Sequence, residues 1–215
     1  MRIRPLRLLP IGAALLAAAC AAPAPRAGSD AAGTPAPRPG AAGTPMVRGV
    51  DHVGLTVPDA NQAVAFFSDV LGCQEAFRFG PFKDDQTDFM RQLLDVDPRA
   101  VIEQLVMMRC GQGSNIELFQ YSAPDQQRAA PRNSDWAGHH VAFYVADIEP
   151  AARALRARGI KTFLGPFKVE AGPAAGQSIL YFLAPWGQQL ELISYPGGMA
   201  YERDSSVRLW APGAP

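Results

Sequence analysis

An internal repeat is the feature that most constrains this chain. Segments 51–57 (DHVGLTV) and 139–145 (HHVAFYV) are both rich in β-branched and aromatic residues, which predicts a strand for each. His52 and His140 lie 88 positions apart, and each is followed directly by valine. We therefore expect the two segments to occupy equivalent places in two copies of one small structural unit.

A second pair of predicted strands supports the same repeat. Segments 115–121 (NIELFQY) and 189–195 (QLELISY) share a Glu-Leu core and end on tyrosine. The two glutamates are Glu117 and Glu191. Each copy of the unit should therefore begin near a histidine and end near a glutamate.

Helix signals follow the first strand of each copy at the same offset. Asp59 and Asp147, again 88 positions apart, are good N-cap residues, and Gly72 and Gly159 are good helix stops. Pro150 falls in the first turn of the second helix, where proline is tolerated. Each copy is therefore predicted to be a strand, a helix and then further strands.

The remaining strands complete the two copies. The first copy contains an extra segment, 87–96, that is predicted to form a short helix ended by Pro98, followed by a strand over 101–108. The second copy has predicted strands near 162–169 and 178–183. The predicted fold class is α+β, with two tandem βαβββ units.

The N-terminal part of the chain resembles an export signal. Residues 1–20 combine a basic lead with a short apolar run that ends at Cys20, and the run is too short to span a bilayer as a mature helix. The pattern resembles a bacterial lipoprotein signal, although its leucine, Leu16, sits one place early. The alternative is a plain secretory signal. Either interpretation predicts export, to the periplasm or, through a lipid anchor at Cys20, to the outer membrane.

The rest of the chain divides by composition. Residues 21–46 are mostly Ala, Pro, Gly and Thr, which predicts a disordered linker. The folded domain is predicted over 47–197, with units at about 47–122 and 136–197. The tail, 198–215, carries Trp210 as a possible anchor. Lys and Arg together number 20, as do Asp and Glu, so the net charge of zero argues against a nucleic-acid partner.

The recurring histidines and glutamates are the candidate chemistry. The carboxylate inside the segment Ile-Glu-Leu-Phe is expected to face a buried side of its strand, where an unpaired charge is costly. If the two units pack about a pseudo-two-fold axis, the four side chains converge and predict a site for one divalent ion: Zn, Ni, Co, Mn or Fe. The alternative is a pair of core histidines bonded to glutamates. His139 lacks a repeat partner and should face the other side of its strand, in a supporting or surface position.

These motifs, taken together, resemble the vicinal oxygen chelate superfamily over residues 47–197. That group includes glyoxalase I, methylmalonyl-CoA epimerase, extradiol dioxygenases and the fosfomycin and bleomycin resistance proteins. The resemblance implies that the metal ligands are His52, Glu117, His140 and Glu191. It also implies a cup-shaped mixed sheet around the metal and a small substrate that chelates it through two adjacent oxygens. It is compatible with a homodimer.

The number of ligands favours one chemistry within this superfamily. Four protein ligands on an octahedral ion leave two positions for a bidentate substrate, whereas a two-His, one-carboxylate set leaves three and suits oxygen activation. We therefore expect a lyase or isomerase that stabilises an enolate, with Glu191 as the base and Glu117 as the alternate. Methylmalonyl-CoA epimerase, a member of this superfamily, has glutamine at the position that corresponds to Glu117. The alternatives are an Fe(II) dioxygenase with Glu117 unligated and a metal-free binding module of the bleomycin-resistance type.

Two cysteines in the predicted domain leave a choice open. Cys73 and Cys110 could pair in an oxidising compartment, or remain as buried free thiols.

Overall fold

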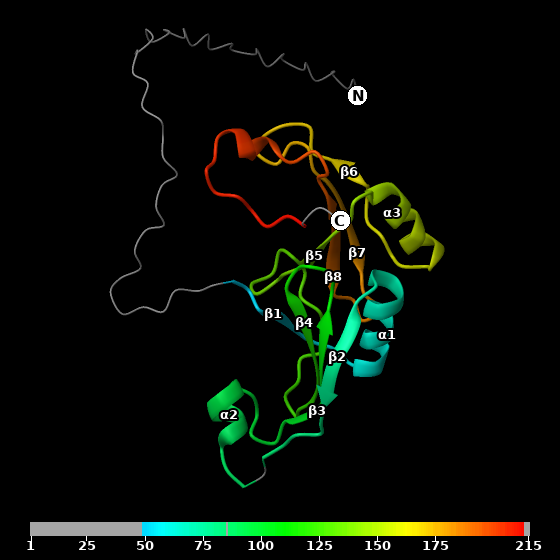
Figure 1. The fold of residues 1–215 in the computed structure, drawn as a ribbon. Helices are drawn as coiled ribbons and strands as arrows, with labels where there is room; N and C mark the ends of the chain where they lie inside the picture. Colours follow the sequence, from blue (N-terminus) through cyan, green and yellow to red (C-terminus); the bar gives the residue numbers. More distant parts are fainter. Residues whose placement is uncertain (1–48, 85, 213–215) are drawn as a thin grey trace, which may run out of the picture. The chain divides into compact units, whose positions relative to one another are not determined.

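The computed structural model describes residues 49–84 and 86–212 (Figure 1). The export signal predicted at 1–20 and the linker predicted at 21–46 lie outside the described residues. Among the described residues, no helix is both long and apolar enough to cross a membrane.

The first unit is a four-stranded mixed sheet in the order β1-β4-β3-β2. Strand β1 runs parallel to β4, and the other neighbours are antiparallel. Its elements, in chain order, are β1 (His52–Thr56), α1 (Ala60–Leu71), β2 (Gln74–Phe79), α2 (Phe89–Leu94), β3 (Val101–Arg109) and β4 (Asn115–Ser122). The helix α2 lies in the extra segment, as predicted.

The second unit repeats this plan in the order β5-β8-β7-β6. Its strands β5 and β8 are parallel, as β1 and β4 are in the first unit. Its elements are β5 (Val141–Tyr144), α3 (Ile148–Ala157), β6 (Phe167–Lys168), β7 (Ser178–Leu183) and β8 (Gln189–Ser194). A short 3-10 helix, Ala200–Arg203, follows in the tail. The predicted α+β class and the two tandem βαβββ units are confirmed.

The helix boundaries follow the predicted caps. The Asp59 carboxylate accepts a hydrogen bond from the Gln62 backbone N–H at 2.8 Å, which satisfies one unpaired donor of the first turn. Asp147 does the same for Glu149 at 3.1 Å. Gly72 ends α1 with φ +72°, a left-handed conformation that glycine adopts without a steric penalty.

Two predicted boundaries are wrong. Helix α2 ends at Leu94, with Asp95 in the left-handed region at φ +55°, so it stops before Pro98 is reached. The strand predicted near 162–169 is reduced to β6 and one isolated bridge between Thr162 and Phe182. Pro166 interrupts this segment because it has no backbone N–H to donate to a neighbouring strand.

One apolar core joins the two units. It gathers Leu55 and Leu118 from the first sheet with Phe182 and Leu190 from the second, all at most 2% exposed. The Phe67 ring of α1 lies 6.2 Å from that of Phe143 and 6.1 Å from that of Trp186. Because successive residues of a strand face opposite sides, the other face of each sheet is left for the site.

The choice left open for the cysteines is resolved by a disulfide between Cys73 and Cys110. It joins the residue directly before β2 to the residue directly after β3, across a sequence separation of 37 residues. The Cys73 residue is only 3% exposed and belongs to the shared core.

Candidate functional site

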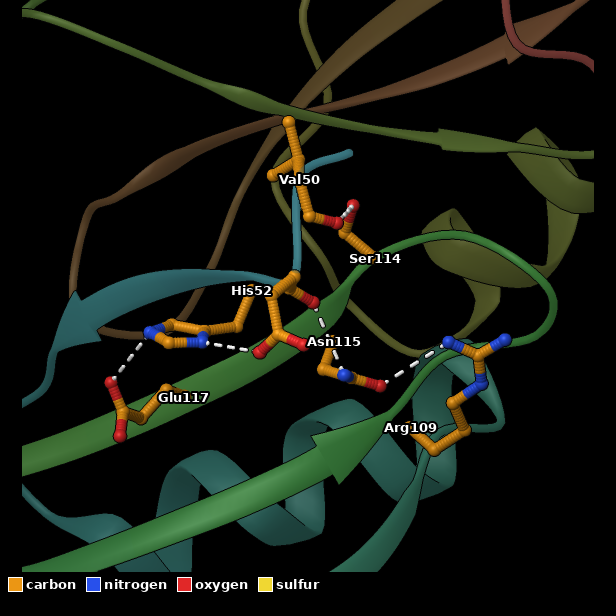
Figure 2. Close-up of polar contacts among 7 residues, drawn as sticks. Val50, His52, Arg109, Ser114, Asn115 and Glu117 are labelled. Atoms are coloured by element: carbon orange, nitrogen blue, oxygen red, sulfur yellow. Dashed lines mark hydrogen bonds and ion pairs between the residues drawn. The ribbon is translucent and has the colours of Figure 1, made fainter. Parts of the chain in front are cut away.

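The first histidine and glutamate form a contact on the non-core face of the first sheet (Figure 2). His52 opens β1, Glu117 lies on β4, and their Nε2 and Oε2 atoms are 3.2 Å apart. In the parallel register Glu117 is opposite Gly54, which has no side chain to separate the two groups. The histidine and the glutamate of the first unit therefore lie in direct contact.

A series of hydrogen bonds supports the His52 ring at Nδ1, the nitrogen that does not contact Glu117, as Figure 2 shows. Its Nδ1 lies 2.8 Å from a carboxylate oxygen of Asp51. The backbone carbonyl of Asp51 accepts from the Asn115 amide at 3.1 Å, and the Asn115 oxygen accepts from Arg109 at 3.2 Å. The hydrogen bond to Asp51 is the largest cause that raises the pKa of His52, with a smaller contribution from the charge of Glu117.

The tautomer that follows is informative. A carboxylate can only accept, so Nδ1 of His52 must carry a proton, and in the neutral ring Nε2 then presents a lone pair to Glu117. A lone pair and a carboxylate face each other favourably only when a cation lies between them or when the ring is doubly protonated. Imidazole nitrogen and carboxylate oxygen are also the donor types that suit the expected ions.

The second pair repeats the contact with a different support. His140, directly before β5, places Nε2 3.0 Å from Oε2 of Glu191 on β8. Its Nδ1 lies 3.2 Å from the side-chain nitrogen of Asn133, which can only donate. In this arrangement Nε2 carries the ring proton and donates it to Glu191.

The two glutamates differ in their surroundings. The side chain of Glu191 is 7% exposed and that of Glu117 is 16% exposed. Burial raises the pKa of Glu191, and His140 and a hydrogen bond from Tyr181 partly oppose that rise. Glu191 is therefore a carboxylate that holds its proton more tightly than usual.

Tyr181 is the site residue that the sequence analysis missed. It lies on β7 directly opposite Glu191, and its ring meets that of His140 edge to face at 5.1 Å. The equivalent position opposite Glu117 is Met107, which has no hydroxyl group. The strand that carries Tyr181 was predicted, but its pairing register with β8 had no sequence signal.

The four predicted ligands are brought together as two pairs. Among the described residues, no group of three or more His, Cys, Asp or Glu side chains is placed to hold a metal ion. The donor types fit a divalent ion, and Nδ1–H of His52 donates to Asp51 as in many metal ligands, whereas Nδ1 of His140 accepts from Asn133. Each pair thus contains two of the four predicted ligands.

His139 belongs to neither pair. Its Nδ1 lies 3.1 Å from the Ala137 carbonyl oxygen, and its Nε2 lies 3.4 Å from the side-chain nitrogen of Gln188. The first contact requires a proton on Nδ1, so Nε2 accepts from Gln188.

Known proteins resemble this chain in sequence and in fold. A family model described as the Glyoxalase/Bleomycin resistance protein/Dioxygenase superfamily matches residues 51–181. A protein of Actinomyces sp named 2-epi-5-epi-valiolone epimerase is 46% identical over 171 residues, which are 79% of this chain and 92% of that protein. A solved glyoxalase family protein from Bacillus cereus is 20% identical, with a TM-score of 0.56, over 73% of this chain and 100% of that one. The last likeness concerns the fold alone.

Proposed function

Because this chain belongs to the glyoxalase/bleomycin resistance protein/dioxygenase superfamily, we propose that it is an epimerase, which inverts a carbon atom next to a carbonyl group of a small molecule. The relative that is 46% identical carries that activity in its name and is covered almost completely. The structural observation that supports the proposal is the contact of His140 with the buried carboxylate of Glu191. An isomerase also agrees with the redox-neutral chemistry expected from the sequence.

Glu191 is the proposed base. It would remove the proton next to the carbonyl, and return of a proton to the opposite face would invert the carbon. A raised pKa makes the ionised carboxylate a stronger base, because general-base efficiency rises as the pKa approaches the working pH. Glu117, less buried and opposite a methionine, is the weaker candidate.

Tyr181 is the proposed positioning residue for this base. Its hydroxyl group donates to Glu191 and its ring lies against His140, so it contacts both members of the pair. A carboxylate held from two sides keeps one orientation, and a fixed orientation towards the substrate is a large part of proton-transfer catalysis.

One divalent ion is part of the proposal, with His52, Glu117, His140 and Glu191 as its ligands. When bound, such an ion would polarise the substrate carbonyl and stabilise the enolate. The lone pair that His52 directs at Glu117 supports this assignment. To bind through Nε2, His140 would have to carry its proton on Nδ1, and Asn133 would have to present its amide oxygen instead of its nitrogen.

Exchange of a substrate proton for deuterium tests the function. The assay follows, by NMR in heavy water, the hydrogen next to the carbonyl of an α-hydroxy ketone. The wild-type protein should catalyse exchange, and Glu191→Gln should slow it by about 10²–10⁴-fold, the usual contribution of a general base. Glu117→Gln is the matched control and should be milder.

The same assay separates the rival activities. Exchange that survives Glu191→Gln and disappears in Glu117→Gln would reverse the roles of the two glutamates. Metal-dependent oxygen consumption with a catechol, and no proton exchange, would identify a dioxygenase. Tight binding of a small molecule with neither reaction would identify a binding module.

Export is also part of the proposal. It is supported by the basic and apolar sequence before Cys20 and by the Cys73–Cys110 disulfide, because such bonds persist mainly in oxidising compartments. The protein should fractionate with membranes and become soluble on Cys20→Ser. Recovery of full-length protein from the cytoplasm with Met1 intact would contradict export.

We also propose that the protein forms a homodimer. Phe77 and Phe79, each 52% exposed, lie on β2, the edge strand of the first sheet, and exposed edge strands readily pair with another chain. Sedimentation equilibrium should therefore give twice the chain mass, and Phe77→Lys should shift the distribution to monomer. A wild-type monomer at high concentration would contradict it.

A further inference from the structure

The two histidines of the site sit differently in their sheets. His52 is the first residue of β1 and lies in register with Asn115 of β4. In the second unit β5 begins at Val141, so His140 lies outside the ladder that β5 forms with β8. The hydrogen bonds of a ladder fix the main chain of the residues that they join. The first unit therefore holds its histidine one residue further inside the sheet than the second unit does.

Asn115 accounts for this difference. Its backbone N–H and its side-chain amide nitrogen both donate to the carbonyl oxygen of Asp51, at 3.0 Å and 3.1 Å. Gln189 stands at the equivalent position of the repeat, and in the part of the chain that the structure describes no hydrogen bond joins it to the carbonyl group of His139. The main chain directly before His52 is thus held by contacts that the second unit lacks.

The partners of the Asn115 amide fix its orientation. Its oxygen accepts from Arg109 at 3.2 Å, and its nitrogen donates to the Asp51 carbonyl oxygen (Figure 2). A guanidinium group can only donate and a carbonyl oxygen can only accept, so the reversed amide would lose both bonds. Arg109 also donates to the Gly113 carbonyl oxygen in the turn between β3 and β4. Asn115 therefore links β3, β4 and the segment that enters β1 in one arrangement.

This arrangement extends to the ring of His52. The Asp51 carboxylate accepts from Nδ1–H of His52 at 2.8 Å. The side chain of Asp51 is 84% exposed, so its position depends on its main chain and not on packing around the carboxylate. A carboxylate has no proton to donate, and the contact therefore permits only the neutral tautomer whose Nε2 atom is free to bind a cation.

The support of His140 does not select a tautomer in the same way. Its Nδ1 atom lies 3.2 Å from the side-chain nitrogen of Asn133, on the segment between β4 and β5. An amide group can present either its nitrogen or its oxygen to a ring nitrogen, so Asn133 can support either tautomer. Of the two histidines, only His52 is held by a partner that permits a single neutral form.

We propose that Asn115 is a positioning residue for the proposed metal site. It holds the main chain of Asp51, Asp51 holds the ring of His52, and the Nε2 atom of His52 is kept ready for the divalent ion. His52 then binds the ion without rearrangement, whereas His140 must first change its tautomer. The assignment rests on the proposed function for the ion, and on the hydrogen bonds described above for the role of Asn115.

Nitrogen NMR of the chelator-treated protein reads the tautomer. The chain has three histidines, so long-range proton–nitrogen spectra resolve each ring, with His139→Ala and His140→Ala for assignment. At alkaline pH, where the rings are neutral, His52 should carry its proton on Nδ1. Asn115→Ala should give a mixture of both tautomers at His52. Gln189→Ala, the matched change in the second unit, should leave the His52 signals unchanged.

Metal affinity is the second readout, measured by competition for Zn²⁺ with a chromophoric chelator. Asn115→Ala should raise the Kd by about 10–100-fold, the usual cost of removing an outer support of a metal ligand. Asp51→Ala should raise it at least as much, and adding Asn115→Ala to that variant should have no further effect, because Asn115 acts through Asp51. Gln189→Ala should leave the Kd nearly unchanged.

A second variant keeps the test independent of folding. Should the thermal midpoint show that Asn115→Ala is poorly folded, Asn115→Asp replaces it. Aspartate keeps the shape of the side chain and the acceptor for Arg109 but has no donor for the Asp51 carbonyl. It should give the same mixture of tautomers at His52.

The outcomes separate this proposal from the proposed function. A wild type that binds no Zn²⁺, yet protonates His52 at Nδ1 and loses that preference in Asn115→Ala, would uphold the role of Asn115 and end the proposed metal site. An unchanged tautomer and Kd in Asn115→Ala, beside proton exchange in the wild type, would overturn the role of Asn115 and keep the proposed function. Equal losses of affinity with and without Asp51→Ala would also overturn it.

Discussion

Removing the Cys73–Cys110 disulfide should cost a large part of the stability of this domain. A cross-link stabilises mainly by restricting the unfolded chain, and the restriction grows with the length of the loop it closes. For the 37-residue separation here, the chain-entropy relation gives about 4 kcal/mol at room temperature. Domains of this kind typically have a free energy of unfolding of about 5–15 kcal/mol, so the loss should be easy to measure.

The measurement compares urea unfolding, followed by circular dichroism, of the parent and of Cys73→Ala/Cys110→Ala. Both proteins carry Cys20→Ser, so that no third thiol can exchange. Alanine avoids placing a hydroxyl group at Cys73, which is 3% exposed in the core. The variant should unfold at a lower urea concentration, with a free energy of unfolding lower by about 4 kcal/mol.

A reductant provides the internal check. Dithiothreitol should lower the free energy of unfolding of the parent towards that of the double variant and leave the variant itself unchanged. Equal stabilities of parent and variant, or two free thiols in the unreduced parent after unfolding, would refute the reasoning. Either result would also withdraw one support for export.

Three further outcomes follow from the site. Tyr181→Phe should lower the kcat of exchange in the wild type and in Glu117→Gln but have no further effect in Glu191→Gln, because a residue that acts only through Glu191 loses its role with it. Equal effects on kcat in all three backgrounds would make Tyr181 merely structural. By plasma emission spectrometry, His140→Ala should lose the bound divalent ion and His139→Ala should keep most of it; the reverse would show that the repeat alignment is wrong. With any metal removed by a chelator, Glu191→Gln should raise the thermal midpoint of unfolding at pH 7 but not at a pH below the ordinary carboxyl pKa. The raised pKa of Glu191 in the folded state means that folding penalises only the ionised carboxylate, and glutamine removes that penalty. An equal rise of the midpoint at both pH values would contradict this prediction.

The pattern of the repeat was sufficient to predict most of the strands and the helices that surround each pair. His52 opens β1 and His140 directly precedes β5, so their matching positions place both histidines at the start of equivalent strands. Caps such as Asp59 act over three residues and are visible in the sequence for the same reason. Each of these features depends only on neighbours within one element or one pair of strands.

Features that depend on packing between elements were not predictable. Tyr181 meets Glu191 because of the register of β7 against β8, which no turn motif specifies. The separation of the four predicted ligands into two pairs depends on how the two units pack, and no residue pattern encodes that arrangement. The disulfide was left open because the Cys73 and Cys110 spacing alone does not show that their Cα atoms come within 4.3 Å.

The shared aromatic core limits how the two pairs can move. The Phe67 ring of the first unit contacts the Phe143 and Trp186 rings of the second, and Arg158 of the second unit donates to the Asp69 carbonyl of the first at 3.3 Å. The two units are therefore packed together through the core, on the face of each sheet opposite the His–Glu pairs. A small rotation of one unit against the other about this core would change the distance between the two His–Glu pairs. The packing of the core thus sets how far apart the two pairs lie.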